Sequence, residues 1–167
     1  MSRAADEVAA SAVALAIERG ITVATAESLT AGLVAATLAD TPGASGMLQG
    51  GVVAYQNAVK AGILGVSEKL LSAVGSVDAE VAMAMAEGAR LACAADVGVS
   101  TTGVAGPLPH DGRSVGTVFI GVATSSGAEA HAYSFLGDRA GIRSQATVAA
   151  LERLLECLVR ADLPPVK

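Results

Sequence analysis

The chain has 167 residues and a net charge of −5, with hydrophobic types at 52% and charged types at 16%. Low hydrophobicity with high net charge keeps a chain unfolded, and this chain has neither, so disorder is excluded. These values predict one soluble domain spanning residues 1–167. Aromatic residues are only 2% of the chain. We therefore expect a core of Ala, Val, Leu, Ile and Met in which the layers lie close together.

The acidic balance also limits the partners. Eleven basic residues against sixteen acidic ones leave no basic footprint for nucleic acid. The longest strongly apolar run, residues 115–123, is far shorter than the roughly 20 residues of a membrane span, and the first residues do not form a secretory signal. We expect a cytoplasmic protein that binds neither nucleic acid nor membrane. Ala-rich helices with apolar faces to cover predict a homo-oligomer.

Hydrophobic periodicity predicts helices and strands that alternate through the first two-thirds of the chain. Helices are expected at residues 5–19, 29–38, 57–63, 78–94 and 138–161, and strands at 21–26, 47–55, 96–102, 115–124 and 128–135. Ser67 is a plausible N-cap, Ser76 is one for the helix at 78–94, and Asp138 is one for the last helix.

The last two predicted strands flank Ser125-Ser126-Gly127, which has the residues and spacing of a hairpin turn. Alternating helices and strands followed by a late hairpin predict an α/β fold. We expect a three-layer α/β/α sandwich around a mixed sheet of about five strands. Open sheets of this kind bind ligands at the carboxyl ends of their strands. Polar and glycine-rich segments at those ends are therefore the candidate functional segments.

The first such segment, Glu27-Ser28-Leu29-Thr30, follows the strand at 21–26. A serine hydroxyl there can act on a bound carbonyl, and N–H groups at a helix start can stabilise a developing oxyanion. Helix capping by Ser28 and Thr30 is the competing explanation.

The second segment runs from Tyr55 to Lys60 after the second predicted strand. A serine nucleophile needs a base, and neither His110, in a polar loop, nor His131, within a strand, is well placed. A desolvated lysine with a lowered pKa can take that role. The competing explanations are a solvated surface lysine at Lys60 and a half-buried strand-end aromatic at Tyr55.

Two later segments are suited to an anionic ligand. Residues 103–107, Gly-Val-Ala-Gly-Pro, follow the third strand and let a ligand approach the main chain, but they lack the Lys and Ser/Thr of a P-loop, so a plain turn is the alternative. Arg139 and Arg143 lie four residues apart on one face of the last helix, suited to an anion or to pairing with Glu. No Cys, His or Asp cluster has metal-ligand spacing, so we predict no metal.

Taken in order, these segments resemble the CinA C-terminal domain family. The resemblance rests on residues 26–32, 55–60, 64–66, 103–107, 115–118 and 137–143, and it covers nearly the whole chain. It implies a nicotinamide-nucleotide amidase, which hydrolyses the small-molecule nucleotide nicotinamide mononucleotide to nicotinate mononucleotide and ammonia without a cofactor. It implies Ser28 as nucleophile and Lys60 as base, with substrate contacts at Thr30, Tyr55, Thr102, Gly103, Arg139 and Arg143.

The chain departs from the family pattern at two points. Residues 108–112 read Leu-Pro-His-Asp-Gly where many members have a further glycine-rich stretch, which predicts a shorter and stiffer loop near the phosphate or ribose. The N-terminal molybdopterin-binding-like domain of longer members is not found, so no pyrophosphatase activity is expected. The alternative function is a non-catalytic nucleotide-binding or interaction module connected with competence or DNA damage. A solvated Lys60 far from Ser28 would favour that alternative.

Overall fold

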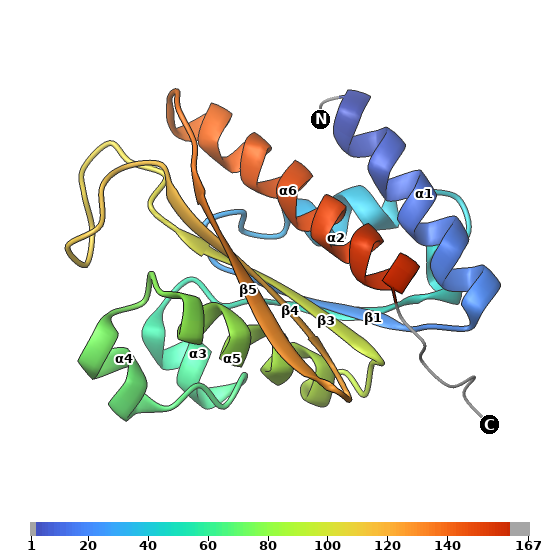
Figure 1. Ribbon diagram of the computed structural model, residues 1–167, viewed down its shortest axis with the longest axis horizontal. Coiled ribbons are helices and arrows are strands. Elements are labelled where there is room, and N and C mark those ends of the chain that lie inside the picture. Colours follow the sequence, from blue (N-terminus) through green and yellow to red (C-terminus); the bar gives the residue numbers. More distant parts are fainter. Residues whose placement is uncertain (1–2, 161–167) are drawn as a thin grey trace.

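The computed structural model describes residues 3–160 and shows a mixed five-stranded sheet between two layers of helices (Figure 1). In chain order the elements are α1 (Arg3–Arg19), β1 (Val23–Glu27), α2 (Leu33–Ala39), η1 (Ala44–Gly46), β2 (Leu48–Val53), α3 (Asn57–Gly62), α4 (Glu68–Val74), α5 (Ala79–Ala92), β3 (Val97–Gly103), β4 (Thr117–Thr124), β5 (Gly127–Ser134) and α6 (Arg139–Arg160). The strand order is β2-β1-β3-β4-β5. Strand β1 is parallel to β2 and β3, and β4 is antiparallel to β3 and β5.

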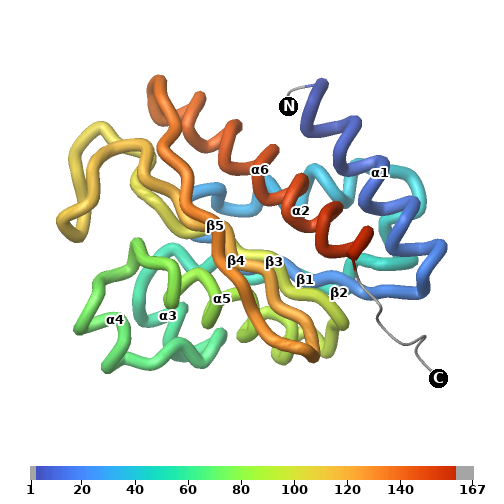
Figure 2. Tube along the Cα trace, in the orientation of Figure 1, coloured from blue at the N-terminus to red at the C-terminus, as the bar shows by residue number. Residues whose placement is uncertain are grey.

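Helices α1, α2 and α6 cover one face of the sheet, and α3, α4 and α5 lie on the other (Figures 1 and 2). Helix α6 packs on α1 and over β3 and β4, while α5 crosses β1, β3, β4 and β5. The predicted three-layer α/β/α sandwich is confirmed, and so is the late hairpin, in which Thr124 pairs with Gly127. Residue 161, where the last helix was expected to end, lies outside the described residues. No helix within residues 3–160 is long and apolar enough to cross a membrane.

The core is built from small aliphatic side chains, as the composition predicts. One cluster of buried side chains lies under α1 and α6 and another under α5, and in the described part of the chain neither cluster contains a buried aromatic ring. Tyr133 and Phe135 are only partly buried at the margin of the first cluster. The three middle strands are buried along most of their length, as expected for strands with helices on both faces.

Glycine brings α5 into direct contact with the backbone of the sheet. A Cβ atom at Gly98 in β3 would collide with the carbonyl oxygen of Ala86, and one at Gly121 in β4 would collide with that of Ala82. Between them, the buried hydroxyl of Ser100 donates a hydrogen bond of 2.6 Å to the Ala82 carbonyl. The helix therefore lies too close to these strands for even a methyl group.

Two helix starts differ from the prediction, and the first lies beside the candidate serine. Helix α2 begins at residue 33, four residues later than expected. The Glu27 carboxylate accepts hydrogen bonds from the N–H groups of Gly32, Val34 and Ala35 at 2.9, 3.0 and 2.8 Å. Residues 28–32 consequently form a turn, in which Ala31 has φ 51°. Ser28 is therefore not the cap of α2, because the Glu27 carboxylate accepts the hydrogen bonds from the first N–H groups of the helix.

The second difference concerns α5, which Ser76 does not cap. The cap is Asp78, whose Oδ1 accepts a hydrogen bond of 2.9 Å from the N–H of Glu80. The N–H and hydroxyl groups of Ser76 both donate to Asp111 instead, at 2.6 and 2.7 Å. Ser67 does cap α4, by accepting from the N–H of Leu70.

Gly98→Ala should lower the free energy of unfolding by about 1–3 kcal/mol, because the added methyl group forces α5 away from β3. Gly62→Ala is the matched control, since nothing lies within 4 Å of a Cβ at Gly62 in α3. Denaturant unfolding of both variants measures the difference. Equal stability of the two variants would contradict the close packing of α5 on the sheet.

Candidate active site

The carboxyl ends of β1, β2 and β3 meet around a cavity of about 450 Å³, a volume typical of small-molecule sites. Its walls come from segments far apart in the sequence, because the parallel strands place their ends at one edge of the sheet. The lining residues are Ser28, Leu29, Tyr55, Ser76, residues 103–110 and Arg139. Four of the residues expected in the site therefore line it: Ser28, Tyr55, Gly103 and Arg139.

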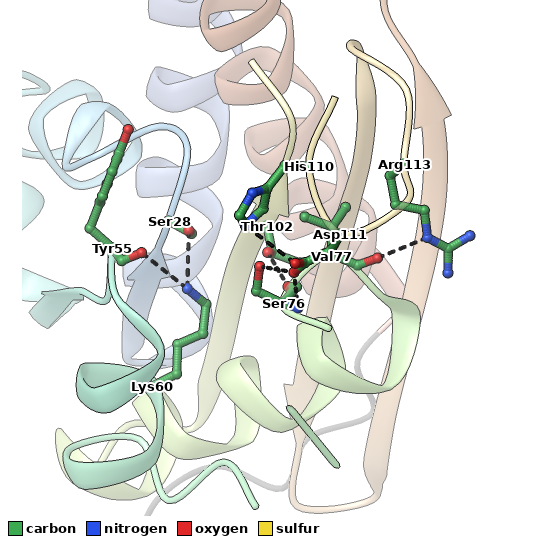
Figure 3. A network of polar contacts seen from close by, with 9 residues as sticks. All are labelled: Ser28, Tyr55, Lys60, Ser76, Val77, Thr102, His110, Asp111 and Arg113. Carbon is green, nitrogen blue, oxygen red and sulfur yellow. Dashed lines mark hydrogen bonds and ion pairs between the residues drawn. The ribbon is translucent and has the colours of Figure 1, made fainter. Parts of the chain in front are cut away.

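Lys60 lies directly behind Ser28. Its Nζ is 3.3 Å from the Ser28 Oγ and donates to the carbonyl oxygen of Tyr55 at 3.4 Å (Figure 3). It also donates to the carbonyl oxygen of Ala54 at 2.9 Å. The side chain is 1% exposed, so Lys60 is not a solvated surface lysine. Ser28 itself is partly exposed at the cavity wall. The serine hydroxyl is therefore placed between the cavity and a buried amine.

Burial lowers the pKa of Lys60 from 10.5 to about 8, and the Asp111 carboxylate acts against this by stabilising the charged form. An amine with that pKa is neutral in about one molecule in ten at pH 7. A neutral amine accepts the Ser28 hydroxyl proton, whereas an ammonium only donates. The site therefore holds a serine with an available base, the arrangement that activates a hydroxyl for attack on a carbonyl.

The turn that carries Ser28 is held from several sides. The Ser28 N–H donates to the Thr101 carbonyl at 2.9 Å. From α6, the Arg143 guanidinium donates to the carbonyl oxygens of Leu29 at 2.8 Å and Thr30 at 2.9 Å. The Thr30 hydroxyl donates to the Glu27 carboxylate at 2.6 Å. These contacts fix the main chain on both sides of the nucleophile candidate.

Three of the residues implied as substrate contacts, Thr30, Thr102 and Arg143, are not among the residues that line this cavity. The Thr30 hydroxyl and the Arg143 guanidinium make hydrogen bonds that hold the turn carrying Ser28. Thr102 is 1% exposed, and its hydroxyl donates to the Ser76 carbonyl at 2.6 Å. The polar groups of these residues instead bond to main-chain carbonyls and to the buried Glu27 carboxylate. Conversely, His110 lines the cavity, although its position in a polar loop argues against a role as base. The Asp111-Gly112 pair that follows it is the one sequence signal of a tight turn there.

The cavity is suited to an anionic ligand. Arg139 donates to the Gly106 carbonyl at 2.7 Å and to the Tyr55 hydroxyl at 2.6 Å, so it joins two walls. None of the described residues that line the cavity is Asp or Glu. The hydrogen bonds of residues 3–160 also leave the N–H groups of Leu29, Ala105 and Gly106 without an acceptor. In the same residues, no three His, Cys, Asp or Glu side chains are grouped to hold a metal ion.

A sequence profile of the CinA C-terminal domain matches residues 5–158. The chain belongs to the CinA C-terminal domain family. It is 46% identical over 150 residues to a CinA-like protein of Frankia casuarinae, covering 90% of this chain and 34% of that protein. With a CinA-like protein of Anaeromyxobacter dehalogenans it shares 48% identity over 152 residues, covering 89% of this chain and 37% of the relative. This CinA-family chain thus spans about a third of the length of these curated relatives.

Solved structures of CinA proteins share the whole fold. The competence/damage inducible protein CihA from Agrobacterium tumefaciens superposes with a TM-score of 0.91 at 31% identity, covering 96% of this chain and 98% of that one. A competence-damaged protein (CinA) superfamily protein from Escherichia coli gives a TM-score of 0.89 at 28% identity, covering 93% and 92%. The resemblance seen in the sequence motifs is therefore confirmed at the level of the family.

Lys60→Met should change how stability depends on pH. The unfolded chain holds the lysine proton up to pH 10.5 and the native protein only up to about pH 8, so native stability rises with pH through that window. The free energy of unfolding of Lys60→Met relative to the native protein should be greatest at pH 7. It should fall by about 3 kcal/mol as the pH rises to 10.5.

Chemical denaturation at pH 7 and pH 10 measures this change, with Lys69→Met, at an exposed lysine of α4, as the control. A Lys60→Met difference that stays the same at both pH values would show that Lys60 keeps an ordinary pKa.

Proposed function

We propose that this CinA-family protein is an amidohydrolase that converts nicotinamide mononucleotide to nicotinate mononucleotide and ammonia. The observation that carries the proposal is the buried Lys60 amine, 3.3 Å from the hydroxyl of Ser28, with Ser28 on the wall of a cavity. A non-catalytic binding module has no need for a buried amine against a serine hydroxyl, because removing a charged group from water is unfavourable.

Ser28 and Lys60 divide the first half of the reaction. The neutral Lys60 amine takes the proton of the Ser28 hydroxyl, and the Oγ attacks the carboxamide carbon. The resulting oxyanion needs hydrogen-bond donors, and the N–H of Leu29 is the free donor next to the nucleophile. The C–N bond breaks once the nitrogen has received a proton, and ammonia leaves. Water then hydrolyses the acyl ester on Ser28, and Lys60 returns its proton to the Ser28 Oγ.

The charge of the cavity favours a phosphate-bearing amide. Arg139 uses only part of its guanidinium on Gly106 and Tyr55, and a guanidinium binds phosphate oxygens with well-matched geometry. Tyr55 is half exposed and is the aromatic ring among the lining residues, available to contact a pyridine ring. The remaining recognition falls to main-chain N–H groups without an acceptor, such as those of Ala105 and Gly106 in the cavity lining.

Incubation of the purified protein with nicotinamide mononucleotide should release ammonia. Ser28→Ala and Lys60→Ala should each reduce kcat by at least about a thousandfold, because the nucleophile and its base act as a unit. Lys69→Ala, at an exposed lysine, should retain native activity. Ammonia release that survives the loss of the Ser28 hydroxyl would overturn the mechanism. Calorimetric binding of nicotinamide mononucleotide without ammonia release would support the binding module instead.

The pH profile tests the role of Lys60 separately. The active form of the base is the neutral amine, so kcat/KM for an aryl ester of nicotinate mononucleotide, whose phenolate leaves without a proton, should rise with pH and level off above an apparent pKa of about 8. The sign follows from protonation, since acid converts Lys60 to an ammonium that cannot accept the serine proton. Steady-state kinetics between pH 6 and pH 9.5 measures the rise. A flat profile across this range would contradict a lysine base.

A further inference from the structure

The loop after β3 fixes the backbone of His110 beside the cavity. His110 and Arg113 pair across a tight turn: the Arg113 N–H donates to the His110 carbonyl at 2.8 Å and the His110 N–H to the Arg113 carbonyl at 3.1 Å. The two residues between them, Asp111 and Gly112, have φ of 49° and 70°. Two positive φ angles define a type I′ turn, for which Asp-Gly is a preferred sequence. The backbone of His110 is therefore fixed by local structure.

Side chains tie the same turn to the start of α5. Asp111 Oδ2 accepts the N–H and hydroxyl of Ser76 at 2.6 and 2.7 Å. Arg113 donates to the Val77 carbonyl at 3.2 Å (Figure 3), and it pairs with Asp78 at 3.0 Å. The hydrogen bonds from Ser76 hold the pKa of Asp111 below its usual value, so the carboxylate stays ionised. The turn is thus attached to the fold on both sides of its tip.

His110 lies beside the anchored Asp111 and lines the cavity that Ser28 also lines. Its Nε2 is 3.5 Å from Asp111 Oδ1, and its side chain is 65% exposed. It lines the same cavity as Ser28, and in Figure 3 the ring lies between Ser28 and the Asp111–Ser76 contact. Asp111 thus lies beside an imidazole that substrate can reach.

Lys60 is poorly placed for the remaining proton transfers. Its amine bonds to the Ser28 hydroxyl and to two main-chain carbonyls, and it is not among the residues that line the cavity. The departing nitrogen and the attacking water both lie on the cavity side of Ser28. Of the described titratable side chains in the lining, Tyr55, Arg139 and His110, only histidine ordinarily exchanges a proton near neutral pH.

We propose that His110 is the second acid–base residue of this site, an inference that rests on the proposed amidase function. After Lys60 has taken the Ser28 proton and the tetrahedral intermediate has formed, the His110 imidazolium gives its proton to the substrate nitrogen. The C–N bond breaks and ammonia leaves. Water then attacks the acyl carbon and gives a proton to the neutral imidazole, while Lys60 returns its proton to the Ser28 Oγ as the ester C–O bond breaks. Both residues end in their starting protonation states.

A change of leaving group separates this role from substrate binding. An aryl ester of nicotinate mononucleotide releases a phenolate that needs no proton, whereas the amide nitrogen cannot leave without one. His110→Gln should lower kcat/KM for nicotinamide mononucleotide by about a hundredfold or more. The rate of the phenolate burst, which measures formation of the acyl enzyme, should stay within about threefold of the native rate.

His131→Gln, at the other histidine of the chain, on β5, is the matched control and should leave both reactions at native rates. Equal losses on amide and ester in His110→Gln would show that His110 only binds the nucleotide and would overturn the inference, while Ser28→Ala still abolished both reactions. A native protein that releases no ammonia would overturn the proposed function and this inference together. Thermal unfolding of each variant confirms that the comparison concerns folded protein.

Discussion

The burial of one amine against one hydroxyl constrains this structure more than any other contact. Lys60 lies in the last turn of the short helix α3. Its Nζ makes hydrogen bonds with the Ser28 hydroxyl and with two main-chain carbonyls that follow β2. Ser28 follows β1, so the contact requires β1 and β2 to be parallel neighbours in the correct register. An amine withdrawn from water favours its neutral form, and that form is the one that can accept a proton from serine. The position of Lys60 in the fold therefore determines its chemistry.

A second constraint acts on the serine itself. The Glu27 carboxylate takes the N–H groups at the start of α2, while Arg143 takes the carbonyls just after Ser28. An anion thus binds the donors of the turn and a cation binds its acceptors. The main chain is held in an irregular conformation without using the Ser28 hydroxyl, which remains available to Lys60 and to the cavity. Ser28 therefore does not have to cap α2, because the Glu27 carboxylate accepts the hydrogen bonds of the helix start.

The many small residues of the chain determine how closely its layers pack and which groups line the cavity. Small residues let α5 lie on the backbone of β3 and β4, and the glycine-rich residues 103–106 leave main-chain N–H groups at the cavity. The chain carries a net charge of −5, yet the described cavity wall holds Arg139 and His110 and no carboxylate. The ionisable side chains of the cavity wall are therefore basic although the chain as a whole is acidic.

The sequence by itself determined the order of the elements, the mixed sheet, the small-residue core and the family, because periodicity, turn residues and motif order are local properties. It also predicted Ser28 and Lys60 as candidate site residues, and the structure places the Lys60 Nζ 3.3 Å from the Ser28 Oγ. Only the tertiary structure decided which polar groups face the cavity. Thr30, Thr102 and Arg143 bond to main-chain and buried groups, whereas His110 reaches the wall through a turn anchored on Ser76. Those outcomes depend on hydrogen-bond partners tens of residues away, which spacing along the chain does not reveal.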